Sequence, residues 1–226
     1  MAWTERPGRN KCPTFKEDNM SESMLKSDLT EFASALASSA PVPGGGGAAA
    51  LAGALAAALG SMVGNLTVGK KKYKDNEPRL IEMNAAAETL RADLLRQIDA
   101  DAEGFEPLSK AYGIPKDEPG RDETLEKCLH MAAAAPMEIL RLSCDAVALA
   151  EEYARLGSKL MISDAGCAAA LGEAAIRAAA LNVRVNTRLM KDRDYAETMN
   201  QELEERLQKY IPVAKETYSI VEGELA

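Results

Sequence analysis

The stretch that decides the fold is residues 41–74, which read PVPGGGGAAALAGALAAALGSMVGNLTVGKKKYK. A Pro-x-Pro entry leads into four glycines, a run of small apolar residues and a lysine cluster. No charged residue occurs from Phe32 to Gly69. Small residues that recur every four positions let neighbouring helices approach closely. The stretch therefore predicts a buried central helix over about residues 48–68 of a soluble protein, and not a membrane span.

The rest of the chain also favours helices. Aromatic residues make up only 4% of a chain rich in Ala, Leu, Glu and Lys, and strict apolar–polar alternation is missing. Apolar periodicity predicts further helices that begin after a Ser27–Asp28 cap, near Leu80, near Asp122, after a Ser163–Asp164 cap, and at Asp192 or Asp194. We expect Pro107 and Pro212 to kink or end their helices and Pro136 to interrupt its own.

These patterns predict an all-α bundle of long, partly kinked helices around a buried Ala/Gly-rich central helix. We expect residues 27–226 to form a single domain that follows a polar tail at residues 1–26. The net charge of −8 argues against general nucleic-acid binding, which needs a basic face. The four cysteines form no C-x-x-C pair and suit a reduced, cytoplasmic protein. We expect no membrane partner.

The chain offers little for metal or nucleophilic catalysis. Its one histidine, His130, has no H-x-x-x-H or H-x-E partner, and the zinc-deaminase signature is missing. We therefore expect no metal site. Any hydrolytic or deaminating chemistry must use carboxylates, lysines, amides and oriented water.

One carboxylate lies within an apolar helix face. With about 100° per residue and Ile98 as zero, Asp101 falls near −60°, among Leu94, Phe105 and Leu90, while Asp99 falls outside the face. A carboxyl held against apolar groups has a raised pKa, which suits acid–base work. The alternative is a buried salt bridge or hydrogen bond to another helix.

Other polar residues admit both a binding and a structural interpretation. Gly44–Gly47 can present backbone N–H groups at a helix start to an anion, or can simply connect two helices. The lysines at 70, 71, 72 and 74 either face a cleft or form a solvated patch. Asn182 and Asn186, one turn apart, either bind a ligand or link helices, and Asp164 is first a helix cap.

These stretches together resemble a known family, the cyclodeaminase and cyclohydrolase proteins of tetrahydrofolate metabolism. The resemblance spans about residues 27–192 and rests on PVPGGGG at 41–47, NLTVGKKKY at 65–73, IDADAE at 98–103, SDAG at 163–166 and NVRVN at 182–186. It implies an all-helical, homodimeric, metal-free folate enzyme. It implies no cofactor beyond the tetrahydrofolate substrate, whose tail is optionally polyglutamylated.

The resemblance also suggests roles for individual residues. Asp101 would be the general acid/base or the electrostatic partner of a substrate cation, with Asp99 as the second candidate and Lys71 as a proton relay. Lys70 and Lys72 would hold the anionic glutamate tail. The remaining substrate-binding candidates are Pro43, Gly44, Gly45, Gly46, Gly47, Asn65, Asp164, Asn182 and Asn186.

The predicted reaction is hydrolysis of 5,10-methenyltetrahydrofolate to 10-formyltetrahydrofolate. We favour it because no formiminotransferase domain is fused to this chain. The first alternative is formiminotetrahydrofolate cyclodeaminase activity, which releases ammonia and gives 5,10-methenyltetrahydrofolate. The second is a non-catalytic helical assembly module. A phosphate-cradling nucleotide protein fits less well, because the Ser/Thr that follows a P-loop lysine is missing.

Overall fold

The computed structural model describes residues 28–226, so the predicted polar tail, which includes Cys12, lies outside the described residues. The described part contains six α-helices and two short 3-10 turns, and no strand, which confirms the all-α prediction. The helices are α1 (Leu29–Leu36), α2 (Gly45–Asn65), α3 (Glu77–Ala111), α4 (Arg121–Leu156), α5 (Ile162–Thr187) and α6 (Arg193–Leu225). The 3-10 turns are η3 (Lys71–Asn76) and η4 (Lys159–Met161).

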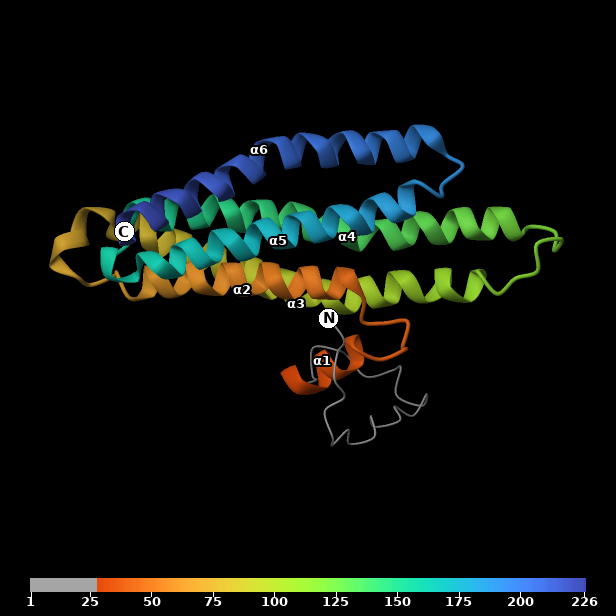
Figure 1. Ribbon diagram of the computed structural model, residues 1–226, viewed down its shortest axis with the longest axis horizontal. Coiled ribbons are helices and arrows are strands. Elements are labelled where there is room, and N and C mark those ends of the chain that lie inside the picture. Colours follow the sequence, from red (N-terminus) through yellow and green to blue (C-terminus); the bar gives the residue numbers. More distant parts are fainter. Residues whose placement is uncertain (1–27) are drawn as a thin grey trace, which may run out of the picture.

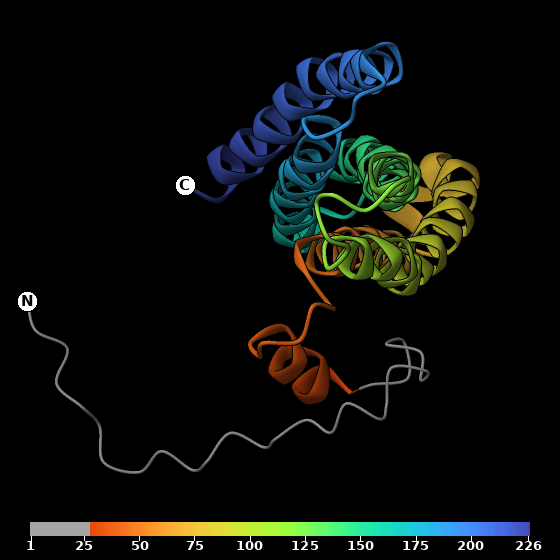
Figure 2. The same cartoon turned by 90° about the vertical axis from the view of Figure 1, so that its right-hand side faces the viewer.

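Four long helices form an elongated bundle of two layers. Figures 1 and 2 show α2 and α5 side by side in one layer, with α3 and α4 behind them. The last helix, α6, leans across α4 and α5, and α1 stands apart beside the start of α2 (Figures 1 and 2). Because α2 packs against α3, α4 and α5, it is the central helix that the sequence predicts.

Glycines allow α2 to lie this close to its neighbours. A Cβ added at Gly60 would lie 2.8 Å from the ring of Tyr153, and one at Gly53 would lie 2.8 Å from Ser143 Oγ. At Gly64 the added Cβ would lie only 1.9 Å from Asn84 Oδ1. Large side chains of α3 and α4 therefore occupy the space that a side chain on α2 would need, as the four-residue spacing predicts.

By length and composition alone, α2 could cross a membrane. More than half of its most apolar window is buried inside the bundle, however. A core helix of a soluble protein gives the same pattern, because its apolar surface is covered by other helices.

Several predicted helix ends are wrong. The central helix begins at Gly45 and ends at Asn65, so three of the four glycines belong to its first turn. The prolines at 107, 136 and 212 lie inside continuous helices, although α6 bends midway along its length in Figure 1. Packing along the bundle outweighs the roughly 3 kcal/mol that an interior proline costs.

Two of the predicted helix caps are present in the structure, and one is not. Asp28 caps α1 in a capping box with Glu31, and Ser27 lies outside the described residues. Asp192 caps α6 by accepting from the Tyr195 N–H. The predicted Ser163–Asp164 cap is wrong, because the turn η4 leads straight into a helix that already begins at Ile162. Asp164 lies instead in the first turn of α5, where its negative charge interacts favourably with the positive end of the helix dipole.

Candidate active site

The Asp101 carboxyl lies directly on the glycine start of α2. A Cβ added at Gly46 would fall 2.1 Å from Asp101 Oδ1 and 2.4 Å from Asp101 Cγ, so only glycine fits here. The Gly47 backbone N–H lies near this carboxyl and favours its ionised form. The N-cap residue of α2 is Gly44, which has no side chain that could cap the helix. A carboxyl from α3 therefore takes the place that a capping side chain would fill.

The surroundings of Asp101 change its acidity. Burial raises its pKa to about 6 from an ordinary value of 3.8, and the Gly47 N–H opposes this rise. A carboxyl with this pKa exchanges its proton close to neutral pH, where general acid/base groups work best. Strongly shifted carboxyls in such surroundings are candidates for functional sites.

Asn182 on α5 covers the other side of the glycine turn. A Cβ added at Gly45 would lie 3.0 Å from Asn182 Nδ2, which itself donates to the Ala178 carbonyl at 2.9 Å. Asn186 is buried, and its Nδ2 donates to the carbonyls of Ala132 at 3.1 Å and Asn182 at 2.9 Å. Asn182 thus lies at the site, while the Asn186 amide links α5 to α4.

Apolar groups complete this end of the site. A Cβ added at Gly47 would contact Pro43 at 3.4 Å, Ile98 at 3.7 Å and Phe32 at 3.9 Å. Pro43 and Phe32 are both buried. Sequence reasoning placed Pro43 here but missed Phe32, whose only signal was its place in the apolar periodicity of α1.

A second group of predicted residues lies at the opposite end of α2. Lys70 Nζ donates to Ser158 Oγ at 3.2 Å, and the Tyr73 hydroxyl accepts from the Lys159 N–H at 3.1 Å. This backbone hydrogen bond is the main cause that lowers the pKa of Tyr73, and burial opposes it. Lys71 and Lys72 are exposed. The result is a cluster of cationic side chains that an anion can reach.

Asn65 lies near this cationic end. The Asn84 amide contacts the Asn65 amide at 2.8 Å and the Tyr153 hydroxyl at 2.9 Å. A hollow of about 390 Å³ beside it is lined by Ala58, Ser61, Met62, Asn65, Leu66, Glu88 and Arg91. Asn84 and Tyr153 were not predicted, because residues this far apart in sequence meet only through packing of α2, α3 and α4.

Within one chain, the structure therefore divides the predicted residues into two groups. The glycine turn, Asp101 and Asn182 lie at one end of α2, and the lysines lie about 30 Å away at the other. Contacts of Gly45 with Asn182 and of Gly172 with Ala56 show that α5 runs antiparallel to α2, which places Asp164 at the lysine end. Asp99 lies about 200° around α3 from Asp101 and thus on a different face.

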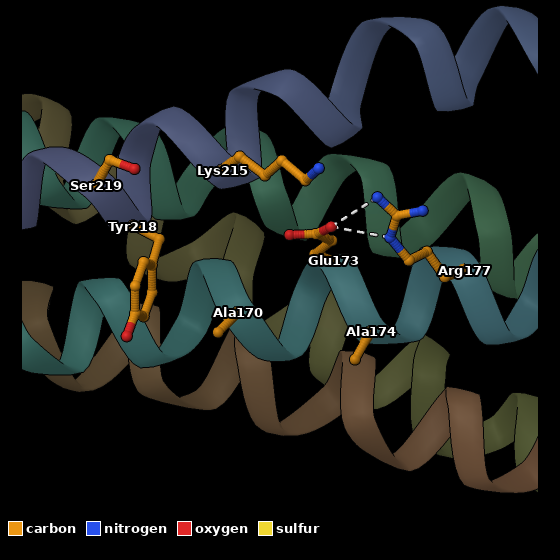
Figure 3. A pocket seen from close by; sticks show the side chains of 7 residues that line it. All are labelled: Ala170, Glu173, Ala174, Arg177, Lys215, Tyr218 and Ser219. Carbon is orange, nitrogen blue, oxygen red and sulfur yellow. Dashed lines mark hydrogen bonds and ion pairs between the residues drawn. The ribbon is translucent and has the colours of Figure 1, made fainter.

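A further hollow in the described residues belongs to neither group. It encloses about 650 Å³ between α5 and α6, and its lining residues are Ala170, Glu173, Ala174, Arg177, Lys215, Tyr218 and Ser219. Figure 3 shows Glu173 paired with Arg177, while Tyr218 reaches from α6 toward α5 beside Ala170. The carboxylate here is thus neutralised by its neighbour, in contrast to Asp101, which leaves the glycine turn as the better acid–base site.

The layer formed by α2 and α5 has an exposed apolar surface. Leu55 and Met62 on α2 are each 46% exposed, and Leu181 and Val185 on α5 are 66% and 49% exposed. Their helical positions place both pairs on the same side of the layer, away from α3 and α4. We call this the α2/α5 face. An uncovered apolar surface of this kind often marks an interaction site.

Fold and site together define an all-helical protein with a carboxyl of raised pKa at the start of its central helix. Comparison with known proteins agrees with this class. The family model described as formiminotransferase-cyclodeaminase matches residues 28–205. The chain therefore belongs to the formiminotransferase-cyclodeaminase family.

Two curated relatives differ in how much of their length the chain covers. The methenyltetrahydrofolate cyclohydrolase of Methylorubrum extorquens is 41% identical over 201 residues, which are 87% of this chain and 97% of that protein. The formimidoyltransferase-cyclodeaminase of Mus musculus is 29% identical over 208 residues, which are 90% of this chain but 38% of that protein. The chain thus matches the full length of the first relative and one part of the second.

A solved structure shares the fold. The crystal structure of formiminotetrahydrofolate cyclodeaminase from Thermotoga maritima aligns with a TM-score of 0.82 at 33% sequence identity, covering 89% of this chain and 98% of that one. The chain therefore shares its helical bundle with this cyclodeaminase structure.

Proposed function

We propose that this protein is a tetrahydrofolate one-carbon enzyme that hydrolyses 5,10-methenyltetrahydrofolate to 10-formyltetrahydrofolate. The observation that carries the proposal is the Asp101 carboxyl, whose pKa burial raises to about 6, held against a glycine-exposed helix start. The 41% identical relative, matched over 97% of its length, bears the name of this activity. The matching cyclodeaminase structure keeps the alternative, ammonia release from formiminotetrahydrofolate, open to the same test.

The chemistry fits the groups at the site. The methenyl carbon of the substrate lies between two nitrogens that share a positive charge, so it is already electrophilic. Ionised Asp101 would accept a proton from the attacking water, which forms a tetrahedral carbon. The protonated carboxyl would then return this proton to the departing nitrogen as the C–N bond breaks, while the hydroxyl on the tetrahedral carbon loses its own proton to solvent and becomes the formyl C=O. The residues supply acid–base catalysis, and the proposed mechanism uses no metal and no further cofactor.

Binding of the substrate would use both groups of residues. The Gly45 turn and Asn182 would contact the pterin, and the exposed Lys71 and Lys72 would attract the carboxylates of the glutamate tail, including a polyglutamate tail. These groups lie about 30 Å apart in one chain. That distance suits neither a single small ligand nor a shared proton relay through Lys71.

A homodimer would remove this difficulty. A second copy related by a two-fold axis across the α2/α5 face would reverse the direction of α2, so its lysine end would lie beside the glycine turn of the first copy. The exposed apolar side chains of this face and the absence of charge on α2 support such a contact. We propose a cytoplasmic homodimer in which each site uses residues from both copies.

A spectrophotometric assay tests the reaction. Purified protein receives methenyltetrahydrofolate in one cuvette and formiminotetrahydrofolate in another. The proposal expects the methenyl absorbance to fall in the first cuvette faster than in a blank, with the rate increasing as pH rises through about 6 as Asp101 ionises. A rise in the second cuvette alone would assign the cyclodeaminase reaction instead. Wild-type activity in Asp101→Asn would remove Asp101 from the mechanism.

Mixing variants tests the shared site. Asp101→Asn and a Lys71→Ala/Lys72→Ala double variant are each inactivated at a different end of α2. If the sites are shared, random exchange of subunits restores about a quarter of the wild-type sites, because half of the dimers then carry one intact site. Mixtures that stay inactive while subunit exchange is complete would place each site within a single chain.

A further inference from the structure

The helix α1 is an outlying element that reaches the bundle beside the candidate site. In Figures 1 and 2 it stands apart from the four-helix bundle, joined to α2 by residues 37–44. Of its eight residues, Phe32 and Ala35 are buried, each 7% exposed, whereas Leu29 is 74% exposed. One aromatic ring therefore makes most of the contact between α1 and the rest of the protein.

That ring packs against the glycine turn, one residue from the position where Asp101 meets it. Phe32 Cζ lies 3.9 Å, and Ile98 Cγ2 3.7 Å, from a Cβ added at Gly47, whose backbone N–H lowers the pKa of Asp101. Phe32 also belongs to the same apolar cluster as Ile98, Ala49 and Ala50. Ile98 precedes Asp101 by one helical turn on α3, so the ring and the carboxyl share the same wall of the site.

We propose that Phe32 is a positioning residue for the Asp101 carboxyl, which it keeps in an apolar surround by closing the site beside Gly47. The inference rests on the function proposed for Asp101. Within residues 28–226, no charged group contributes to the raised pKa of the carboxyl: α2 is uncharged, α5 presents the neutral Asn182 amide, and Asp99 and Glu103 lie on other faces of α3. Burial and the Gly47 N–H are the influences on its pKa.

This role predicts a specific change in acidity. Removing the ring in Phe32→Ala admits water beside the carboxyl, which stabilises its ionised form. We expect the titration midpoint of Asp101 to fall by about one pH unit. The ionised fraction at pH 5 then rises about five-fold, and the acidic limb of the pH–rate profile shifts by the same amount.

The test measures titration directly and does not depend on turnover. The carbons of aspartate carboxyls are labelled with 13C, and the Asp101 signal is identified by its loss in Asp101→Asn. Midpoints are compared for wild type, Phe32→Ala and Phe32→Leu, with Leu29→Ala as a control on the exposed side of α1. We expect a full shift in Phe32→Ala, a smaller one in Phe32→Leu and none in Leu29→Ala.

Two results would overturn the inference: an unchanged midpoint in folded Phe32→Ala, or an equal shift in Leu29→Ala. If Phe32→Ala does not fold, the Asp101 titration midpoint of Phe32→Leu is compared with that of wild type instead, and an unchanged midpoint again overturns the inference. A shifted midpoint in a protein that turns over neither folate would leave the role of Phe32 intact and remove the proposed function. If the enzyme is active, a matching shift in the pH–rate profile would connect the role of Phe32 to the proposed catalytic function of Asp101.

Discussion

Replacing Asp101 with asparagine should stabilise the protein at neutral and alkaline pH while it abolishes activity. Asparagine keeps the shape of the side chain and an oxygen that can accept the Gly47 N–H. It removes the charge that burial disfavours. Catalytic groups held in unfavourable surroundings commonly lower stability in this way.

The size and sign of the effect follow from the two pKa values. The folded-state pKa of about 6 exceeds the ordinary value of 3.8, so the unfolded chain ionises first as pH rises. The resulting loss of stability develops between these two values, is complete above pH 6, and is absent well below pH 3.8. It amounts to about 3 kcal/mol at pH 8 and about 0.6 kcal/mol at pH 4. These are upper limits because the carboxyl keeps some contact with water.

Urea unfolding followed by circular dichroism measures the difference. At one protein concentration, Asp101→Asn should unfold at higher urea than wild type at pH 8, and at nearly the same urea at pH 4. Asp117→Asn, a change at an exposed loop carboxylate, serves as a control and should differ little from wild type at either pH. A variant that is less stable than wild type at pH 8 would refute the argument that burial of the charge is unfavourable.

Two glycine substitutions test the packing of α2. Gly46→Ala should reduce turnover by at least about ten-fold, because its Cβ would meet Asp101 Oδ1 at 2.1 Å and displace the carboxyl. The control Gly223→Ala should leave turnover intact, because no atom lies within 4 Å of the added Cβ. Equal kcat values for the two would contradict this. Gly60→Ala should lower the free energy of unfolding by about 1–3 kcal/mol, measured by urea titration, because the buried Tyr153 ring cannot move away; a neutral or stabilising effect would show that it can.

Much of the candidate site could be predicted from local sequence. The angular position of Asp101 on its helix and the run of glycines at 44–47 were each visible in one short segment. Their contact was not, because it depends on where α2 begins along the length of α3. The helix starts at Gly45 and not at residue 48, so the first turn of α2 consists of glycines and lies directly against Asp101 of α3, a contact between helices that no local pattern shows.

Helix identity was set by the sequence alone, because apolar periodicity and small-residue spacing act within a few turns of the same chain. Tertiary packing decided what happens over longer distances. It carried α3, α4 and α6 through their prolines, since contacts along the whole bundle outweigh one lost hydrogen bond. It also placed the lysines and the glycine turn at opposite ends of α2, because a straight helix separates its two ends by its full length.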